Sequence, residues 1–427
     1  MRFAEAAAGL EARGPGRMVP DLDRIRALAE LLDHPERTYP VIHVAGTNGK
    51  TTTARLIARI LCAHGLATGV YTSPHLQTVR ERLALCDELI PEDEFAETYA
   101  HLRPFLDEVD GRGEPVTYFE ALTAMGFLWF ADKPVDAAVF EVGMGGTWDA
   151  TNIADAKVAV VRSIGLDHPE LGSTVQQVAG EKAGVIKEGT TVIADASEDP
   201  AAREVIAARS EEVGASLLVL GSDVTLEDLI RAVGGQVLHI GGTKAAYKDL
   251  FLPLHGGHQA ENAAAAIAAC EVFLGQALSE DALREALAGA TSPGRLEVVS
   301  RHPLVVLDGA HNPHAARALA PAVDEAFTWA GLHLVVGILE TKDAAGVVSA
   351  LAPVADATYA CANSHERSLA PEQLATVCRE AGLAASAYPD VGAALDAAET
   401  AAGDDDLILV TGSLYTVADA RPRYVKD

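Results

Sequence analysis

The chain has 427 residues, of which 49% are apolar and 22% are charged, and this is enough for two or three domains with buried cores. Its formal net charge of −28 excludes nucleic acid as the main partner, because a protein that binds phosphate backbones needs a basic surface. No apolar run is long enough to span a bilayer and the first residues lack the pattern of a signal peptide, so we expect a cytoplasmic protein with no membrane partner.

Taken in chain order, the first part of the sequence alternates short β-branched strands with longer helices. Strands are predicted at Tyr39–Val44, Ala67–Tyr71, Ala137–Val142, Val158–Ser163 and Thr190–Ala194, and helices at Thr52–His64 and Tyr118–Ala131. This alternation predicts a parallel sheet with helices on both faces. The segment from Ser216 to Leu254 is different, because short alternating stretches and Gly-Gly turns there predict a small antiparallel region.

The strand and helix pattern starts again after His302-Pro303. A helix at Gln259–Leu274 precedes this point, and the strands expected after it are Leu304–Leu307, Leu332–Val336, Ala357–Cys361 and Asp406–Thr411. We therefore expect an α/β protein of two domains. Residues 1–300 should form a P-loop-type domain with a mostly parallel sheet, and residues 301–427 a smaller Rossmann-like domain.

The most informative motif is V-I-H-V-A-G-T-N-G-K-T-T-T, residues 41–53, in which a strand and a glycine turn lead into a helix. Backbone N–H groups and the positive end of a helix converge there, which suits a polyphosphate. Lys50 would reach the outer phosphates, and Thr51 or Thr52 would ligate their Mg²⁺. Val44 stands where the standard G-x-x-x-x-G-K-[ST] loop has its first glycine. The alternative is an ordinary strand–turn–helix junction, but the frame of glycines and lysine favours a nucleotide loop.

Polar residues also follow three other strands of the first domain. Ser73 lies in T-S-P-H-L, Glu141 opens E-V-G-M-G-G-T-W-D-A-T-N, and His168 ends S-I-G-L-D-H. Because ligands bind at the carboxyl ends of parallel strands, these side chains would meet near the phosphate loop and complete the coordination of Mg²⁺. Taken singly, each is explained as well by a turn, a cap or a loop histidine. Their joint occurrence after successive strands favours the metal site.

Other polar residues have two readings on local grounds. Lys182, in G-E-K-A-G, is either a site lysine or a solvent-facing helix residue. Thr117 and Glu120, in T-Y-F-E, are favoured as a helix N-cap and its first-turn acid over substrate contacts. Asp308 and His311, in D-G-A-H-N-P, follow the first strand of the second domain, where an Asx turn is an equal alternative to a ligand site.

The five cysteines are scattered along the chain and do not form a recognisable motif. They are Cys62, Cys86, Cys270, Cys361 and Cys378, and none has a C-x-x-C neighbour. We expect reduced and mostly buried thiols rather than a disulfide framework or a zinc site.

Together the motifs resemble those of folylpolyglutamate synthase and the bifunctional dihydrofolate synthase–folylpolyglutamate synthase, within the Mur ligase superfamily. The resemblance runs from L-D-R-I-R-A-L at Leu22 to T-G-S-L-Y at Thr411, and also includes L-D-H, E-K-A-G, H-Q-A-E-N-A and D-G-A-H-N-P. G-T-N-G-K-T alone fits any Mur-type ligase. The motifs T-S-P-H-L, T-Y-F-E and D-A-T-N select the folate branch.

The resemblance implies roles for individual residues. It implies ATP contacts at Gly46, Thr47, Asn48, Gly49, Lys50, Thr51, Asn262, Arg295 and Asp308, Mg²⁺ ligands at Thr51, Ser73, Glu141 and His168, and pterin contacts at Thr117, Phe119, Asp149 and Ala150. Lys182 matches a lysine that is carbamylated in this family, which turns an ammonium into a carboxylate-like ligand for magnesium. With Lys50 and His168 it is an expected catalytic residue, whereas the role of His311 stays open.

Two positions depart from the family pattern. The phosphate loop reads G-K-T-T where many folate enzymes have an extra glycine after the lysine, so it also resembles the loop of peptidoglycan ligases. Thr147-Trp148 replaces the more usual arginine-containing pair in G-G-R-x-D-A-T-N, which puts an anion contact from this loop in doubt.

The reaction implied by the resemblance is ATP-dependent amide formation through an acyl phosphate. L-Glutamate would be added to dihydropteroate, to the tail of reduced folates, or to both, by a monomer that releases ADP and phosphate. Three alternatives stay open: a Mur-type ligase acting on a peptidoglycan precursor, a P-loop kinase or regulatory NTPase, and a catalytically silent binding protein.

Overall fold

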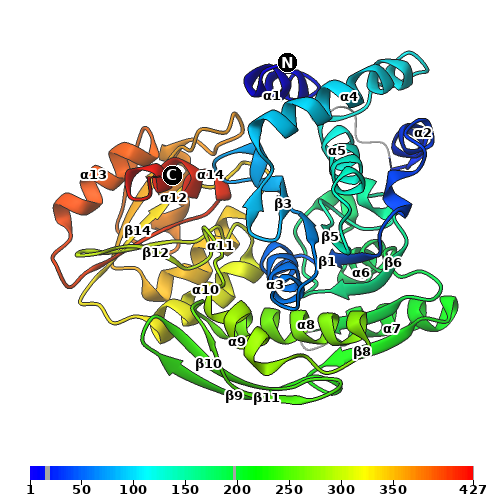
Figure 1. Ribbon diagram of the computed structural model, residues 1–427. Coiled ribbons are helices and arrows are strands. Elements are labelled where there is room, and N and C mark those ends of the chain that lie inside the picture. Colours follow the sequence, from blue (N-terminus) through cyan, green and yellow to red (C-terminus); the bar gives the residue numbers. More distant parts are fainter. Residues whose placement is uncertain (15–19, 196–198, 427) are drawn as a thin grey trace. The chain divides into compact units, whose positions relative to one another are not determined.

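The computed structural model describes residues 1–14, 20–195 and 199–426 (Figure 1). The chain divides into two compact units. The first unit consists of Met1–Leu229, Val237–Leu252 and Ala260–Ala290, and the second of Ile230–Gln236, Pro253–Gln259 and the chain from Thr291 onwards. Among the described residues, no helix combines the length and the apolar composition that a bilayer crossing requires.

The mostly parallel sheet that the sequence predicted forms the centre of the first unit, and it has eight strands. Its strands are β1 (Val41–Ala45), β2 (Thr68–Tyr71), β3 (Leu83–Leu85), β4 (Glu88–Leu89), β5 (Ala137–Glu141), β6 (Ala156–Val161), β7 (Thr191–Asp195) and β8 (Ser216–Leu220). Their order is β4-β3-β2-β5-β1-β6-β7-β8. The six strands from β2 to β8 in this order are parallel, and β3 and β4 add an antiparallel edge. The carboxyl ends of β1, β2, β5 and β6 therefore share one edge.

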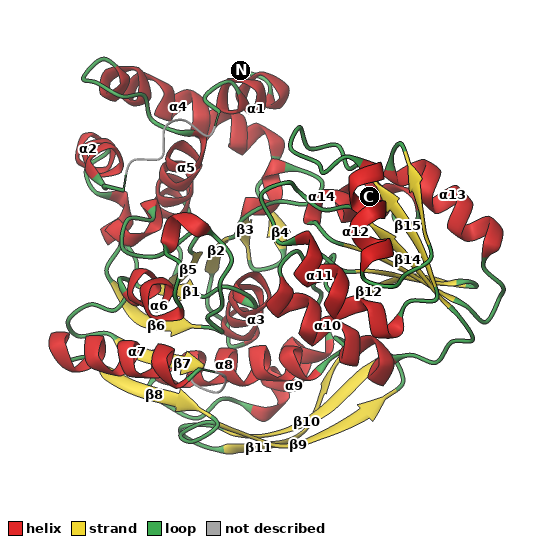
Figure 2. Ribbon diagram, turned by 180° about the vertical axis from the view of Figure 1, so that it is seen from behind, coloured by secondary structure: helices red, strands yellow, loops and turns green. Residues whose placement is uncertain are grey.

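The helices of the first unit pack around this sheet and on one another (Figure 2). They are α1 (Phe3–Glu11), α2 (Asp23–Leu31), α3 (Lys50–Ala63), α4 (Glu92–Asp110), α5 (Tyr118–Asp132), α6 (Val175–Ala183), α7 (Pro200–Val213), α8 (Gly257–Leu274) and α9 (Glu280–Ala288), with short 3₁₀ turns η1 (Pro35–Arg37), η2 (Val79–Arg82), η3 (Ala150–Ile153) and η4 (Pro169–Leu171). Phe127 and Phe130 of α5 pack against Phe140 of β5, with ring centroids 4.7 and 5.6 Å apart. These rings are buried in one hydrophobic cluster, which also includes Ala150 of η3.

The small antiparallel region is confirmed, but it is shorter than expected. Its strands are β9 (Thr225–Ala232), β10 (Gly235–Gly241) and β11 (Ala246–Leu252), in the order β11-β10-β9. Only two residues join β9 to β10, and so short a connection requires antiparallel pairing. The prediction that Ser216–Leu220 belongs to this region is wrong. That segment is β8, which pairs parallel with β7 because α7 supplies the crossover that a parallel connection needs.

The second unit contains a six-stranded sheet in the order β12-β13-β17-β14-β15-β16. Its strands are β12 (Glu297–Arg301), β13 (Leu304–Leu307), β14 (Leu332–Val336), β15 (Ala357–Cys361), β16 (Ala385–Tyr388) and β17 (Leu407–Thr411). Its helices are α10 (Pro313–Ala326), α11 (Ala344–Leu351), α12 (Pro371–Glu380), α13 (Val391–Ala401) and α14 (Leu414–Ala420), with turns η5 (Ala352–Val354) and η6 (Arg421–Arg423). Five strands are parallel and β12 is antiparallel, which gives the expected α/β layering with one reversed edge strand.

The expectation that all cysteines are reduced is wrong for one pair. Cys62, near the end of α3, and Cys86, in the β3–β4 turn, form a disulfide with Cα atoms 5.9 Å apart, well within the usual range. The spacing rule missed it because tertiary structure brings the two residues together. The N–H of Cys86 donates to the carbonyl of Thr68, at the start of β2, which follows α3. The other three cysteines are buried thiols.

Candidate functional site

The phosphate loop connects β1 to α3 and depends on two glycines. Gly46 and Gly49 have φ values of +143° and +82°, which side-chain-bearing residues rarely adopt. A Cβ on Gly46 would lie 2.8 Å from Cβ of Arg162, and one on Gly49 would lie 2.4 Å from Oδ1 of Asn262. Thr47 fastens the loop to the segment after β6, because its N–H donates to the carbonyl of Ser163 over 2.7 Å. The loop is therefore a tightly packed turn at the N-terminus of a helix.

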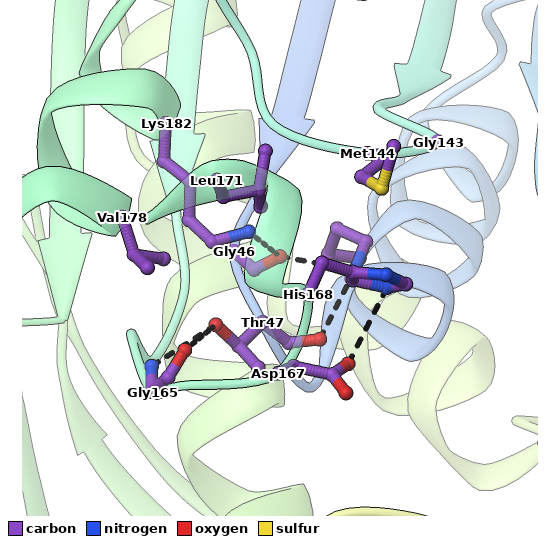
Figure 3. A pocket seen from close by; sticks show the side chains of 11 residues that line it. Gly46, Thr47, Gly143, Met144, Gly165, Asp167, His168, Leu171, Val178 and Lys182 are labelled. Carbon is purple, nitrogen blue, oxygen red and sulfur yellow. Dashed lines mark hydrogen bonds and ion pairs between the residues drawn. The ribbon is translucent and has the colours of Figure 1, made fainter. Parts of the chain in front are cut away.

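Two lysine ammonium groups converge on this loop, and Figure 3 shows the contact of Lys182 with Gly46. Lys50 Nζ donates to the carbonyls of Gly46 and Thr47 at 3.0 and 3.1 Å, and Lys182 Nζ donates to the same Gly46 carbonyl at 2.8 Å. Lys182 is 4% exposed. Burial, together with the positive charge of Lys50, lowers the pKa of Lys182 to about 7. The expected alternative of a solvent-facing lysine at this position is therefore wrong.

The carboxylate of Glu141 joins the first turn of α3 to the end of β2. Its Oε1 accepts a hydrogen bond of 2.7 Å from the hydroxyl of Thr51, and its Oε2 accepts one of 2.9 Å from the N–H of Ser73. Glu141 is 1% exposed, and burial raises the pKa of its carboxyl while the charge of Lys50 opposes this effect. The structure thus brings together three of the four residues predicted to bind Mg²⁺, and it selects Thr51 over Thr52 as the one beside the carboxylate.

His168 lies in a small cavity beside the loop, which we call the phosphate cavity. Its wall contains Gly46, Thr47, Lys50, Gly143, Met144, Gly165, Asp167, His168, Leu171, Val178 and Lys182. The Nε2 atom of His168 is 3.5 Å from Oδ2 of Asp167, and the histidine side chain is 40% exposed. Among the described residues, no three His, Cys, Asp or Glu side chains gather as a protein-only metal cage would require. Mg²⁺ needs fewer, because phosphate oxygens and water fill most of its coordination positions.

A second cavity of about 310 Å³, which we call the aromatic cavity, opens beside the phosphate cavity. It is lined by Asp21, Arg24, Ser73, Pro74, Arg82, Thr117, Phe119, Glu120, Gly143, Met144, Trp148, Asp149 and Ala150. All four residues predicted to contact a pterin are in this wall. Gly143 and Met144 line both cavities, so a ligand in one lies beside a ligand in the other.

Thr117 and Glu120 form the expected helix cap, and Glu120 also makes an ion pair. The Glu120 N–H donates to the Thr117 hydroxyl at 3.2 Å, and the Thr117 N–H donates to the Glu120 carboxylate at 2.8 Å, which is a capping box. Glu120 also accepts from Nε of Arg24 at 3.0 Å. Because Glu120 and Arg24 neutralise each other, Arg82 is left as the other cation of this wall. Arg82 is 8% exposed and stacks on the ring of Tyr118.

The second unit has its own cluster at the end of β13. The carboxylate of Asp308 accepts from the N–H groups of Leu296 and Ala310 at 2.9 and 2.8 Å, and burial raises its pKa while the charge of Arg295 opposes this. His311 donates from Nδ1 to the carbonyl of Gly309 at 2.8 Å. Arg295, Asp308 and His311 therefore surround one loop. The bond from the Ala310 N–H to Asp308 is the Asx turn that the sequence offered as an alternative.

Sequence reasoning missed several residues of the site. Arg162 directly follows β6, and its Nε donates to Oδ1 of Asn262 at 3.0 Å beneath Gly49. Its position after a strand was a signal that could have been used. Arg24 lies in the L-D-R-I-R-A-L motif but was given no role, and Asp167 was passed over in favour of the neighbouring histidine. Only the folded chain shows their proximity.

Comparisons with known proteins find the same kind of ligase along nearly the whole chain. Residues 44–270 match the Mur ligase middle domain, and residues 294–414 match the Mur ligase glutamate ligase domain. The chain is 40% identical to the dihydrofolate synthase/folylpolyglutamate synthase of Mycobacterium tuberculosis, over 96% of this chain and 91% of that protein. It is 32% identical to the Bacillus subtilis protein of the same description, over 99% of both.

Solved structures give the same result. The fold is similar to that of Mycobacterium tuberculosis folylpolyglutamate synthase complexed with ADP, with a TM-score of 0.95 and 38% identity over 100% of this chain and 98% of that one. It is also similar to E. coli FolC in complex with DHPP and ADP, with a TM-score of 0.88 and 33% identity over 99% and 97% of the two chains.

Proposed function

The chain belongs to the Mur ligase family, and from this membership we propose that it is an ADP-forming ligase that joins L-glutamate to dihydropteroate, to the glutamate tail of reduced folates, or to both. One observation carries the proposal. The phosphate cavity, which two lysines enter, and the aromatic cavity, which is large enough for a bicyclic ring, share Gly143 and Met144 in their walls. That arrangement suits transfer of a phosphoryl group from ATP to a carboxylate held next to it.

The reaction proceeds in two displacements. An oxygen of the acceptor carboxylate attacks the γ-phosphorus of ATP, the bond to the β-phosphate oxygen breaks, and ADP leaves with that electron pair. The amino group of glutamate then attacks the acyl carbon, the carbon–oxygen bond to phosphate breaks, and the amine loses a proton. Lys50 neutralises charge on the transferring phosphoryl group once its ammonium turns from the loop carbonyls to the nucleotide.

Glu141, Thr51 and Ser73 are the residues that would hold Mg²⁺, with His168 as a further ligand. The donor set fits the ion, because a buried carboxylate beside a hydroxyl supplies the hard oxygen atoms that Mg²⁺ prefers. When bound, the ion would supply positive charge beside the transferring phosphoryl group.

We propose that Lys182 is carbamylated in the active enzyme. The lowered pKa of Lys182 supports this, because a neutral amine near pH 7 is the form that attacks CO₂. A nitrogen–carbon bond forms, a proton leaves, and the ammonium becomes an anion beside Lys50. Mass spectrometry of the native protein with isotope-labelled bicarbonate tests the modification, and the variant K182R is the control that should incorporate none.

The remaining site assignments follow the same proposal. Gly46, Thr47, Asn48, Gly49, Lys50, Thr51, Asn262, Arg295 and Asp308 are proposed to bind ATP, and Thr117, Phe119, Asp149 and Ala150 to bind the pterin ring. The Asp308 loop with His311 belongs to the second unit, whose longest segment begins at Thr291. We propose further that the enzyme is a cytoplasmic monomer.

A substrate panel with ATP and glutamate tests the function. Gain of one glutamate on dihydropteroate, read by product mass, establishes the first activity, and a ladder on tetrahydrofolate establishes the second. A UDP-linked muramyl precursor is the control substrate, and product from it alone would favour a peptidoglycan ligase. ADP release that does not depend on glutamate would instead favour a kinase or an NTPase.

A further inference from the structure

A buried histidine of the central strand is connected to the wall of the aromatic cavity through a threonine. The side chain of His43, in β1, is 0% exposed. Its Nε2 atom lies 2.8 Å from the hydroxyl of Thr151, and that hydroxyl lies 2.5 Å from Oδ1 of Asp149. Asp149 in turn lines the aromatic cavity. The three side chains therefore form a continuous hydrogen-bonded line from the middle of the sheet to the cavity.

The direction of each hydrogen bond follows from the donors present. The carboxylate of Asp149 meets four donors, which are the N–H groups of Gly143, Met144 and Thr151 and the hydroxyl of Thr151. Since the Thr151 hydroxyl gives its only proton to Asp149, its oxygen must accept one from Nε2 of His43. Burial lowers the pKa of His43 to about 3, so the ring is neutral and carries its single proton on Nε2.

The other ring nitrogen agrees with this tautomer. Nδ1 of His43 is buried and has no hydrogen-bond partner in the described part of the chain. A proton there would create a buried N–H without an acceptor, which folded proteins rarely contain. With the proton on Nε2, only a lone pair is left unpaired. The arrangement is thus fixed in one direction, from His43 through Thr151 to Asp149.

Asp149 holds the part of the wall that both cavities share. Its Oδ2 accepts from the N–H groups of Gly143 and Met144, each at 3.0 Å, and these two residues line both cavities. Met144 and Gly143 lie on the same side of the phosphate cavity in Figure 3. His43 stands three residues before Gly46, where the phosphate loop begins. One strand therefore carries the loop and, through Thr151, supports the carboxylate that orders the opposite wall.

We propose that His43 and Thr151 are positioning residues that hold Asp149 and the Gly143–Met144 backbone in place for the pteroate-type substrate. The inference rests on the proposed function for the identity of that ligand. His43 contacts no substrate and moves no proton during the reaction. Its part is to supply one fixed N–H donor inside the core, so that the Thr151 hydroxyl is always oriented towards Asp149.

Four variants test the inference by equilibrium binding of dihydropteroate and of ADP to the full chain. T151V and H43L remove the hydroxyl and the donor at nearly constant volume, whereas T151S and H43Q keep a hydroxyl and an N–H donor at the same reach. We expect T151V and H43L to weaken dihydropteroate binding about tenfold, because each removes one hydrogen bond from the line that holds Asp149 in place. ADP binding should stay within about twofold, and T151S and H43Q should bind dihydropteroate like the parent.

A merely structural role predicts a different result. Equal losses for both ligands, or H43Q as weak as H43L, would overturn the inference. Hydrogen exchange at the Gly143 and Met144 amides provides a readout without substrate, and it should speed up in T151V and H43L but not in T151S. If the parent binds neither dihydropteroate nor tetrahydrofolate, the proposed function fails, and unchanged exchange in T151V would separately refute the positioning role.

Discussion

Replacing Lys182 with methionine should make the protein more stable near pH 7 while it abolishes ligase activity. The ammonium is 4% exposed and its neighbour Lys50 is also positive, which lowers the pKa of Lys182 from 10.5 to about 7. The unfolded chain has the ordinary value. Between these two pKa values the unfolded state therefore binds a proton that the native state lacks, and stability rises with pH. The destabilisation is full below about pH 7 and disappears as the pH passes 10.5.

The magnitude follows from the gap between the two pKa values. At 1.36 kcal/mol for each pH unit, that gap corresponds to a destabilisation of about 5 kcal/mol in acid and about 4 kcal/mol near pH 7. The hydrogen bond from Lys182 to the Gly46 carbonyl offsets about 2 kcal/mol of it. We therefore expect K182M to be about 2 kcal/mol more stable than the parent near pH 7. Near pH 9 the advantage should shrink by about 2 kcal/mol, because half of the pH window has then been crossed.

Urea unfolding of both proteins at the two pH values measures this, in buffers freed of CO₂ so that the lysine keeps its amine. Lys133, whose side chain is 39% exposed in an ion pair with Glu94, provides the control variant K133M. Its unfolding free energy should follow that of the parent at both pH values. The reasoning is refuted if K182M is less stable than the parent near pH 7, or if its advantage is the same near pH 9. Added bicarbonate should stabilise the parent alone, because CO₂ binds only the native amine.

Three further predictions concern other parts of the first unit. G49A should lose nucleotide binding and about 3 kcal/mol of stability by urea unfolding, because the new Cβ adds a close contact with Asn262 to the strain of a positive φ. The control G65A, with φ +86° and open space around it, should lose only about 1 kcal/mol. Equal losses in the two variants would show that the contact with Asn262 is unimportant. F119L should raise KM for dihydropteroate about tenfold through loss of the ring face and leave KM for ATP unchanged in steady-state assays, and a parallel rise in both would contradict the assignment of the aromatic cavity. Serine at both Cys62 and Cys86 should lower the unfolding free energy by about 3 kcal/mol, as expected for a loop of this length, and the parent in reductant should match the variant.

The phosphate loop and the strand-end residues could be predicted because their signals are local. A glycine turn between a strand and a helix fixes where Lys50 and Thr51 must lie, and Ser73 and Glu141 follow strands whose carboxyl ends share an edge. The bounds of the predicted strands agree with the structure within two residues, because they too depend on local sequence patterns. β8 was assigned wrongly because its short apolar run, S-L-L-V-L, does not distinguish a parallel from an antiparallel strand.

Contacts between distant segments could not be predicted. The disulfide joins residues 24 positions apart, and its partners meet only because the β3–β4 turn folds back beside the start of β2. His43 was visible in the sequence as one residue of an apolar strand. Its bond to Thr151 spans 108 positions and depends on η3 packing over β1, which no pattern in either segment records.

The negative net charge of the chain explains why the candidate site needs buried positive groups. With a net charge of −28, the protein repels the polyphosphate and carboxylate groups that the proposed reaction requires, so its site must be positive locally. Lys50 supplies positive charge at the loop itself, whereas Lys182, which is 4% exposed, carries an ammonium there only while it is not carbamylated. A buried cation beside another cation weakens the fold, as the pKa of Lys182 shows, and packing does not require it. A methionine would fill the same space and give a more stable protein. The reason for a lysine at position 182 therefore lies in the chemistry of the site, and unfolding and activity measured together on K182M separate the two contributions.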